Sequence, residues 1–184
     1  MQRAVFLDRD GVINRAVVRE GKPYPPATLA EFEILPGVLD ALRELNEAGF
    51  LLIVVTNQPD VARGLQQREI VEAMHQRLRK ELPLDDIKVC YEVESPTSLC
   101  YKPKPGMLLE AARERDIDLS RSYMVGDRWR DVGCGRAAGC FTIFLDRGYA
   151  ETLRDAPDVI CTDLVQASAF ILHHASLEPT ERRA

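Results

Sequence analysis

Short apolar runs alternate with amphipathic stretches along this chain, and that alternation restricts the folds open to it. The apolar runs have the length and composition of strands buried in a parallel sheet. They are Ala4–Leu7, Phe50–Thr56, Ile87–Tyr91, Tyr123–Val125, Phe141–Leu145 and Val159–Cys161. Helical patterns fall between them, at Pro36–Ala48, Arg68–Glu81, Gly106–Asp116 and Asp131–Ala138. Such alternation predicts an α/β fold, with a doubly wound parallel sheet and right-handed crossovers.

Two long segments interrupt this rhythm. Residues 14–35 are rich in proline and are expected to form an irregular flap, and residues 92–105 form a second long loop. Long structured loops in compact domains are often functional. We expect one domain over residues 1–175 and a frayed polar tail over residues 176–184.

Composition limits the class of partner. The net charge is −5, which argues against a general nucleic-acid binder, and no apolar run is long enough to cross a membrane. The N-terminus enters the first strand without a signal-peptide pattern, so a cytoplasmic monomer is expected. The five scattered cysteines do not indicate a disulfide framework, and Cys134, Cys140 and Cys161 are expected to pack as small apolar residues.

Two aspartates follow the first strand. Asp8 and Asp10 are two apart, so they share a face if the strand continues, and Gly11 lets the chain turn. A pair of carboxylates at the end of a strand is a hard oxygen site that suits Mg²⁺ and, through it, a phosphate. The alternative is that the pair caps a turn, but an unpartnered polar pair on a buried strand is unfavourable.

Three further segments carry polar groups after predicted strands or loops. Thr56 and Asn57 offer a hydroxyl and backbone N–H groups for phosphate oxygens, or they form a turn. Lys102 precedes Pro103 and would bring an ammonium to the anion; the alternative is a solvated lysine. Asp127 would add a third carboxylate to the cation site, or cap the following helix.

Together, the four segments resemble the haloacid dehalogenase superfamily of phosphatases. The resemblance covers about residues 4–162 and rests on the order of the motifs, each placed after a predicted strand. Within the superfamily the chain is similar to the cap-less branch that contains histidinol-phosphate and heptose bisphosphate phosphatases. The segments that carry this similarity are residues 8–14, 56–64, 102–107 and 125–128. The resemblance implies a Rossmann-like domain without an inserted cap.

The resemblance also implies a mechanism. Asp8 would attack phosphorus and form an aspartyl-phosphate, while Asp10 would act as acid and then as base. Asp8, Asp127 and the Asp10 backbone carbonyl would hold Mg²⁺, and Asp131 would support the ion or orient Lys102, or else cap its helix. Thr56, the Asn57 N–H and Lys102 would bind the transferring phosphoryl group. Contacts to the substrate at the rim are expected from Arg63, Lys104 and Arg128.

The implied substrate is a small phosphorylated metabolite. Heptose 1,7-bisphosphate, cleaved at the 7-phosphate, is the first candidate; histidinol phosphate or another sugar or polyol phosphate is the alternative. A non-catalytic module that binds phosphate or a partner protein is a second possibility. A nucleic-acid 3′-phosphatase is a third, and the acidic balance of the chain argues against it.

The chain departs from this branch at its zinc loop. Of the four expected ligands, Cys90 and Cys100 are present, while Glu92 and Ser98 replace a histidine and a cysteine. Structural zinc is normally closed by four Cys or His ligands, so zinc is not expected. Tyr101 replaces an arginine that in the family helps bind the substrate. The three histidines, His75, His173 and His174, are expected to be surface or packing residues.

Overall fold

The computed structural model describes residues 1–177 and contains a six-stranded parallel sheet in the order β5-β4-β1-β6-β7-β8. The strands are β1 (Arg3–Leu7), β4 (Phe50–Asn57), β5 (Asp86–Cys90), β6 (Tyr123–Gly126), β7 (Phe141–Leu145) and β8 (Val159–Cys161). All six match an apolar run of the sequence. The chain builds one half of the sheet from β1 outward and then returns to the other side of β1, which is doubly wound topology.

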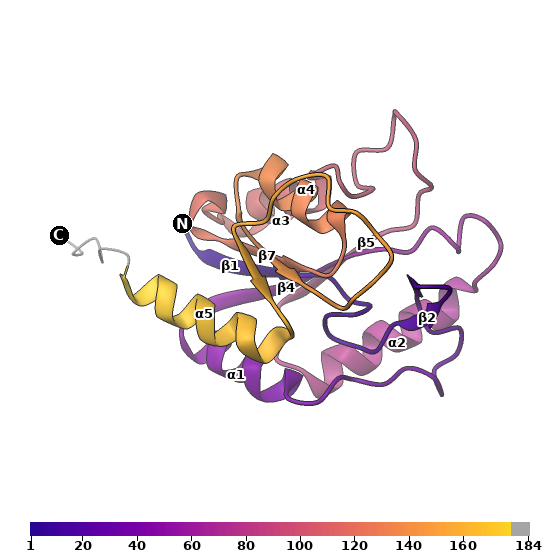
Figure 1. The fold of residues 1–184 in the computed structure, drawn as a ribbon, viewed down its shortest axis with the longest axis horizontal. Coiled ribbons are helices and arrows are strands. Elements are labelled where there is room, and N and C mark those ends of the chain that lie inside the picture. The colour runs from indigo at the N-terminus through magenta and orange to yellow at the C-terminus, as the bar shows by residue number, and fades with distance from the viewer. Residues whose placement is uncertain (178–184) are drawn as a thin grey trace.

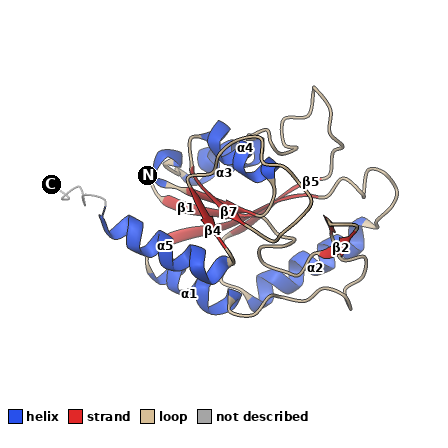
Figure 2. Cartoon of the chain, in the orientation of Figure 1, coloured by secondary structure: helices blue, strands red, loops and turns tan. Residues whose placement is uncertain are grey.

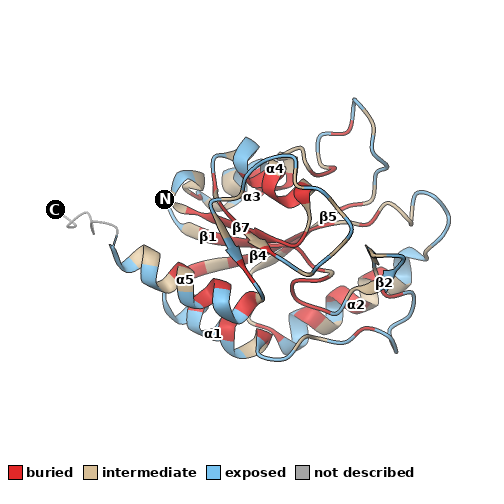
Figure 3. Ribbon diagram, viewed as in Figure 1, coloured by how far each residue is buried: buried red, intermediate tan, exposed pale blue. Residues whose placement is uncertain are grey.

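Helices cover both faces of the sheet (Figures 1 and 2). On one face lie α1 (Val38–Glu47), α2 (Arg68–Glu81) and α5 (Leu164–Leu177), and on the other lie α3 (Gly106–Arg115) and α4 (Trp129–Ala138). The strands are therefore shielded on both sides. Ala4, Val5, Phe6 and Leu7 of β1 are all fully buried, and Figure 3 shows the same burial across the central strands. This explains why the strands appear in the sequence as unbroken apolar runs.

Four elements were not predicted: two short strands, the helix α5 and the 3₁₀ helix η1 (Leu119–Arg121). The expected irregular flap contains a hairpin of β2 (Val17–Arg19) and β3 (Lys22–Tyr24), closed by Glu20 and Gly21, both at positive φ. Such a two-residue turn matches the twist of a hairpin. The helix α5 was also missed, and it continues through Leu177, so Ser176 is helical rather than frayed. The remainder of the expected tail, residues 178–184, lies outside the described residues.

The register of the sheet brings the polar segments together. Leu7 at the end of β1 pairs with Val54 of β4 on one side and with Val125 of β6 on the other. Shortly after these three positions come Asp8, Thr56 and Asp127, which therefore meet at the carboxyl edge of three adjacent strands. Ligands of doubly wound sheets bind at this edge. Within residues 1–177 no helix combines the length and apolarity needed to cross a bilayer.

Candidate active site

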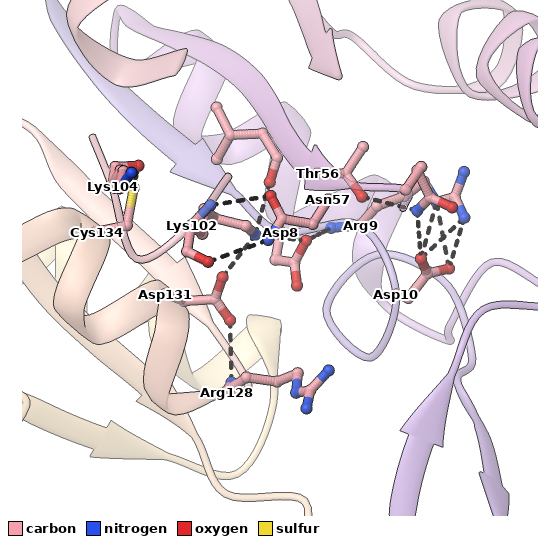
Figure 4. A network of polar contacts seen from close by, with 12 residues as sticks. Asp8, Arg9, Asp10, Thr56, Asn57, Lys102, Lys104, Arg128, Asp131 and Cys134 are labelled. Atoms are coloured by element: carbon pink, nitrogen blue, oxygen red, sulfur yellow. Dashed lines mark hydrogen bonds and ion pairs between the residues drawn. The ribbon is translucent and has the colours of Figure 1, made fainter. Parts of the chain in front are cut away.

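Asp8 and Lys102 form the centre of the site. The Lys102 ammonium lies 2.9 Å from Asp8 Oδ1, 2.6 Å from Asp131 Oδ1 and 2.9 Å from the Val55 carbonyl oxygen. Its three donors therefore all have partners (Figure 4). The backbone N–H of Arg9 also donates to Asp8 Oδ1, at 2.7 Å. Lys102 and the Arg9 N–H both contact Oδ1 of Asp8, and neither of them contacts Oδ2.

The electrostatics of this pair follow from its burial. Burial, together with the negative charge of Asp131, raises the pKa of Asp8 from 3.8 to about 6, although Lys102 opposes the shift. For Lys102 the neighbouring charges outweigh burial in setting the pKa. Burial disfavours its charged form, but Asp131 and Asp8 outweigh that effect and raise its pKa above the ordinary value. Lys102 therefore stays charged, while the ionised form of Asp8 is only partly stabilised by it.

Asp127 is a buried carboxylate, and the Tyr149 hydroxyl beside it opposes part of the rise in its pKa. Asp127 is 1% exposed, and neither of its oxygens makes a hydrogen bond of normal geometry within the described part of the chain. Burial, followed by the charges of Asp8 and Asp131, raises its pKa well above 3.8. Carboxylate oxygens of Asp8, Asp127 and Asp131 lie within 4.8 Å of one another. Three buried carboxylates this close together are a donor set that fits a hard divalent cation.

Asp131 makes the contacts of two of the three roles left open for it. One oxygen accepts from Lys102, and the other accepts from the Arg128 backbone N–H at 3.0 Å at the start of α4. The helix begins at Trp129, two residues earlier than the expected start at Asp131. A single side chain therefore caps the helix and orients the lysine.

The Asp10 carboxylate faces a different set of donors from Asp8. It accepts hydrogen bonds from Arg9, from Asn14 Nδ2 at 2.9 Å and from Gln58 Nε2 at 2.9 Å. Figure 4 shows it turned toward Arg9, on the side away from Lys102. Its side chain is 15% exposed and lines the cavity described below. It is not part of the carboxylate cluster, so only its backbone carbonyl remains a candidate metal ligand.

Thr56 and Asn57 are the last two residues of β4, next to Lys102. Thr56 is 1% exposed, and its hydroxyl accepts from Gln58 Nε2 at 2.9 Å. The Asn57 side chain brackets the Lys102 residue: Oδ1 accepts from the Lys102 N–H at 3.1 Å and Nδ2 donates to the Lys102 carbonyl at 3.3 Å. The sequence predicted a role only for the Asn57 backbone N–H, as a donor to phosphate. The side chain has a further contact, since it holds the backbone of Lys102 in place.

A cavity of about 210 Å³ opens over these groups. Its walls include Asp8, Asp10, Lys102 and three arginines, Arg63, Arg128 and Arg130. Each arginine is paired with a carboxylate: Arg63 with Asp60, Arg128 with Glu151, and Arg130 with Glu94. Arg63 and Arg128 were expected at the rim. Arg130 was not, although it lies only two residues after Arg128.

Comparisons with known proteins agree with this geometry. The HAD-hydrolase-like family profile matches residues 99–167. A D-glycero-D-manno-heptose-1,7-bisphosphate 7-phosphatase of Thermosynechococcus vestitus is 34% identical, over 93% of this chain and 96% of its own. The 7-phosphatase of Escherichia coli K12 is 40% identical, over 78% of each. The crystal structure of a heptose bisphosphate phosphatase from B. bronchiseptica, with magnesium and phosphate, has a TM-score of 0.79 at 29% identity, covering 94% of this chain and 99% of its own.

The chain belongs to the HAD-like phosphatase family. The carboxylates and Lys102 lie where the parallel strands of this phosphatase end, as the sequence motifs predicted. The cap-less expectation agrees with the fold, because the hairpin β2–β3 is the only regular structure between β1 and α1 among the described residues.

One predicted rim residue of the phosphatase faces elsewhere. Lys104 does not line the cavity; its ammonium donates to the backbone carbonyls of Ser95, Pro96 and Ser98, at 2.9, 2.6 and 2.5 Å. These carbonyls belong to the long loop that precedes Lys102. The lysine thus gathers the loop around one positive charge. Its expected contact with substrate is not what this geometry supports.

A disulfide bond joins the two ends of the same loop. Cys90 and Cys100 form a disulfide, with their Cα atoms 5.5 Å apart, which the spacing of the cysteines did not predict. A disulfide provides no thiolate for zinc. Glu92 is close enough to share a metal with two free thiolates, but Ser98 has only a hydroxyl, 3.9 Å from Cys100 Sγ. The residues present do not fit a structural zinc site.

The other cysteines and the histidines behave mostly as expected. Cys134, Cys140 and Cys161 are buried and unpaired. His173 is exposed, and His174 packs on Phe141 and Phe170. His75 is fully buried, but it bonds to Arg9 rather than merely filling space.

Proposed function

We propose that this phosphatase is Mg²⁺-dependent and removes the 7-phosphate of D-glycero-D-manno-heptose 1,7-bisphosphate through an aspartyl-phosphate. The observation that carries the proposal is the buried carboxylate cluster with Lys102 bonded to Asp8 at the ends of β1, β4 and β6. The relatives named for this activity support the choice of substrate.

In the first step Asp8 Oδ2 attacks phosphorus, and the bond to the sugar oxygen breaks. Asp10 gives a proton to that oxygen, so the sugar leaves as an alcohol. Lys102, with the Thr56 hydroxyl and the Asn57 N–H, stabilises the charge on the transferring group. Asp8, Asp127 and the Asp10 carbonyl would hold Mg²⁺, which when bound supplies positive charge between the nucleophile and the phosphoryl oxygens.

In the second step water attacks the phosphorus of the aspartyl-phosphate. Asp10, now ionised, accepts the proton from that water, and inorganic phosphate and the Asp8 carboxylate are released. One residue thus acts as acid and then as base, and no net proton is gained or lost by the protein.

The rim arginines support a bisphosphate. Lys102 and the backbone groups suffice for one phosphoryl group, so the additional guanidinium groups favour a second anionic group on the substrate. Arg130 lies 5.2 Å from the ring of Tyr101, the position where related enzymes carry an arginine, so that side of the cavity retains a positive charge. A second phosphate would compete with Asp60, Glu151 and Glu94 for these side chains.

The test is phosphate release from a panel with Mg²⁺. It compares both anomers of heptose 1,7-bisphosphate, heptose 7-phosphate, histidinol phosphate and fructose 1,6-bisphosphate, with Asp8→Asn as the inactive control. The proposal predicts the highest kcat/KM for one heptose bisphosphate anomer. It also predicts that Arg130→Met lowers the ratio of kcat/KM for the heptose bisphosphate to kcat/KM for heptose 7-phosphate.

Equal, weak activity across the panel would retain the phosphatase chemistry and reject the heptose substrate. A preference for histidinol phosphate would support the alternative substrate. Phosphate release by Asp8→Asn at the wild-type rate would contradict the aspartyl-phosphate mechanism.

A further inference from the structure

Arg9, between the two aspartates of the first motif, is fully buried although it carries a charge. Its guanidinium spans both oxygens of Asp10, with Nε 3.2 Å from each and Nη2 2.8 Å from Oδ2. The guanidinium also lies over the aromatic ring of Phe32, with its carbon 5.9 Å from the ring centroid. A buried guanidinium is tolerated only when its donors are satisfied. The remaining nitrogen, Nη1, therefore also needs a hydrogen-bond acceptor.

That nitrogen is bonded to a histidine on α2. Arg9 Nη1 lies 3.0 Å from His75 Nε2, and the ring is fully buried. Since a guanidinium has only donors, His75 Nε2 must be the acceptor, which places the ring proton on Nδ1. Burial, with the charge of Arg9, lowers the pKa of His75 to about 4, so the ring is neutral at pH 7. Nδ1 makes no hydrogen bond within the described residues, and a carboxylate oxygen of Glu72 lies 3.8 Å from it.

Arg9 contacts both oxygens of the Asp10 carboxylate through one rigid group. Asn14 and Gln58 each reach one oxygen of Asp10, whereas the guanidinium meets both at once. A planar two-point contact fixes the plane of a carboxylate, which a single hydrogen bond does not. The orientation of Arg9 in turn depends on the acceptor at its far end. His75 is thus linked to the cavity wall through one intervening side chain.

We propose that His75 is a positioning residue for the acid–base step: it holds Arg9, and Arg9 holds Asp10. The inference rests on the proposed role of Asp10 as the proton donor to the leaving oxygen. Without the acceptor on His75, Nη1 is left buried without a partner, and the guanidinium has a reason to turn away from Asp10. The expected defect is poor proton delivery rather than poor binding.

Leaving-group dependence separates this role from a loss of stability. An alkyl leaving group such as a sugar needs a proton as its bond breaks, whereas 4-nitrophenolate leaves without one. Since kcat/KM reports the steps up to leaving-group departure, it is compared for a sugar phosphate and 4-nitrophenyl phosphate. The variants are His75→Leu, which removes the acceptor, His75→Gln, which retains one, and Asp10→Asn. Leu78→Ala, one turn further along the same buried face of α2, is the matched control.

For His75→Leu we expect kcat/KM on the sugar phosphate to fall by about tenfold or more, with KM within about twofold of wild type and less than a threefold loss on 4-nitrophenyl phosphate. His75→Gln should recover most of the loss. Rates are normalised to the folded fraction, and Leu78→Ala should lower both substrates equally. If His75→Leu does not fold, Arg9→Lys tests the same link, because it retains the charge and loses the two-point contact.

Two results overturn the inference in distinguishable ways. Equal losses on both substrates for His75→Leu, or no recovery with His75→Gln, would reduce His75 to a packing residue while leaving Asp10 as the acid. If Asp10→Asn itself shows no dependence on the leaving group, the acid role in the proposed function fails, and the role of His75 fails with it.

Discussion

Asp8→Asn should make the metal-free protein more stable, although it removes the nucleophile. Burial and neighbouring charges raise the pKa of Asp8 from 3.8 to about 6, so ionising it in the folded protein is unfavourable. A shift of about two pKa units corresponds to roughly 3 kcal/mol of unfolding free energy at pH 8. An uncharged asparagine avoids that penalty. Because Lys102 already opposes the shift, its attraction is included in the figure.

The sign of the pH dependence follows from proton binding. Between pH 3.8 and about 6 the folded protein holds a proton on Asp8 that the unfolded chain has lost, so the contribution of Asp8 to wild-type stability falls as the pH rises through this window. The advantage of Asp8→Asn should therefore be about 3 kcal/mol at pH 8 and about half of that at pH 5.

Urea unfolding of the EDTA-treated proteins at both pH values measures the difference. Asp40→Asn, on the exposed side of α1, is the control and should change stability by less than about 0.5 kcal/mol. Saturating Mg²⁺ should stabilise the wild type more than the variant and close the gap. A variant no more stable than wild type at pH 8, or a gain of equal size at both pH values, would refute the reasoning.

Three shorter predictions follow. Gly11→Ala should weaken Mg²⁺ binding by about tenfold or more, because φ is +88° and the new methyl carbon would lie 1.8 Å from Asp127 Oδ2. The measurement is the Mg²⁺ concentration for half-maximal activity, and an unchanged value would contradict the prediction. Lys102→Met should lower kcat by about 10²–10³-fold with the fold retained by circular dichroism, since it removes the cation bonded to Asp8; near-normal turnover would contradict it. Lys104→Met should lower the unfolding free energy by about 1–3 kcal/mol in urea, because three loop carbonyls lose their donor, whereas Lys80→Met on the exposed side of α2 should not.

The strands and the position of the carboxylates at their ends could be predicted because their signals are local. A strand covered on both faces must be apolar throughout, and a pair of carboxylates directly after such a strand is unfavourable unless it has a partner or a ligand. The helix α5 was missed because its sequence is apolar on several faces. A local signal was nevertheless present, since Asp163 accepts a hydrogen bond from the Gln166 backbone N–H at the helix start.

Side-chain directions in the loops could not be predicted in the same way. Spacing places Lys104 near the site, but whether its ammonium faces the cavity or its own loop depends on the path of residues 92–101. The bond between Arg9 and His75 joins residues 66 positions apart and requires the packing of α2 against the sheet. No pattern along the chain indicates such a pair.

The loop before Lys102 shows how a metal-dependent scaffold can become independent of that metal. A lysine and a sulfur–sulfur bond hold it, and neither draws on the zinc supply of the cell. Zinc starvation would leave the loop itself intact. The vulnerability moves to thiol chemistry, since a strong reductant would open the disulfide and leave Lys104 to hold the loop.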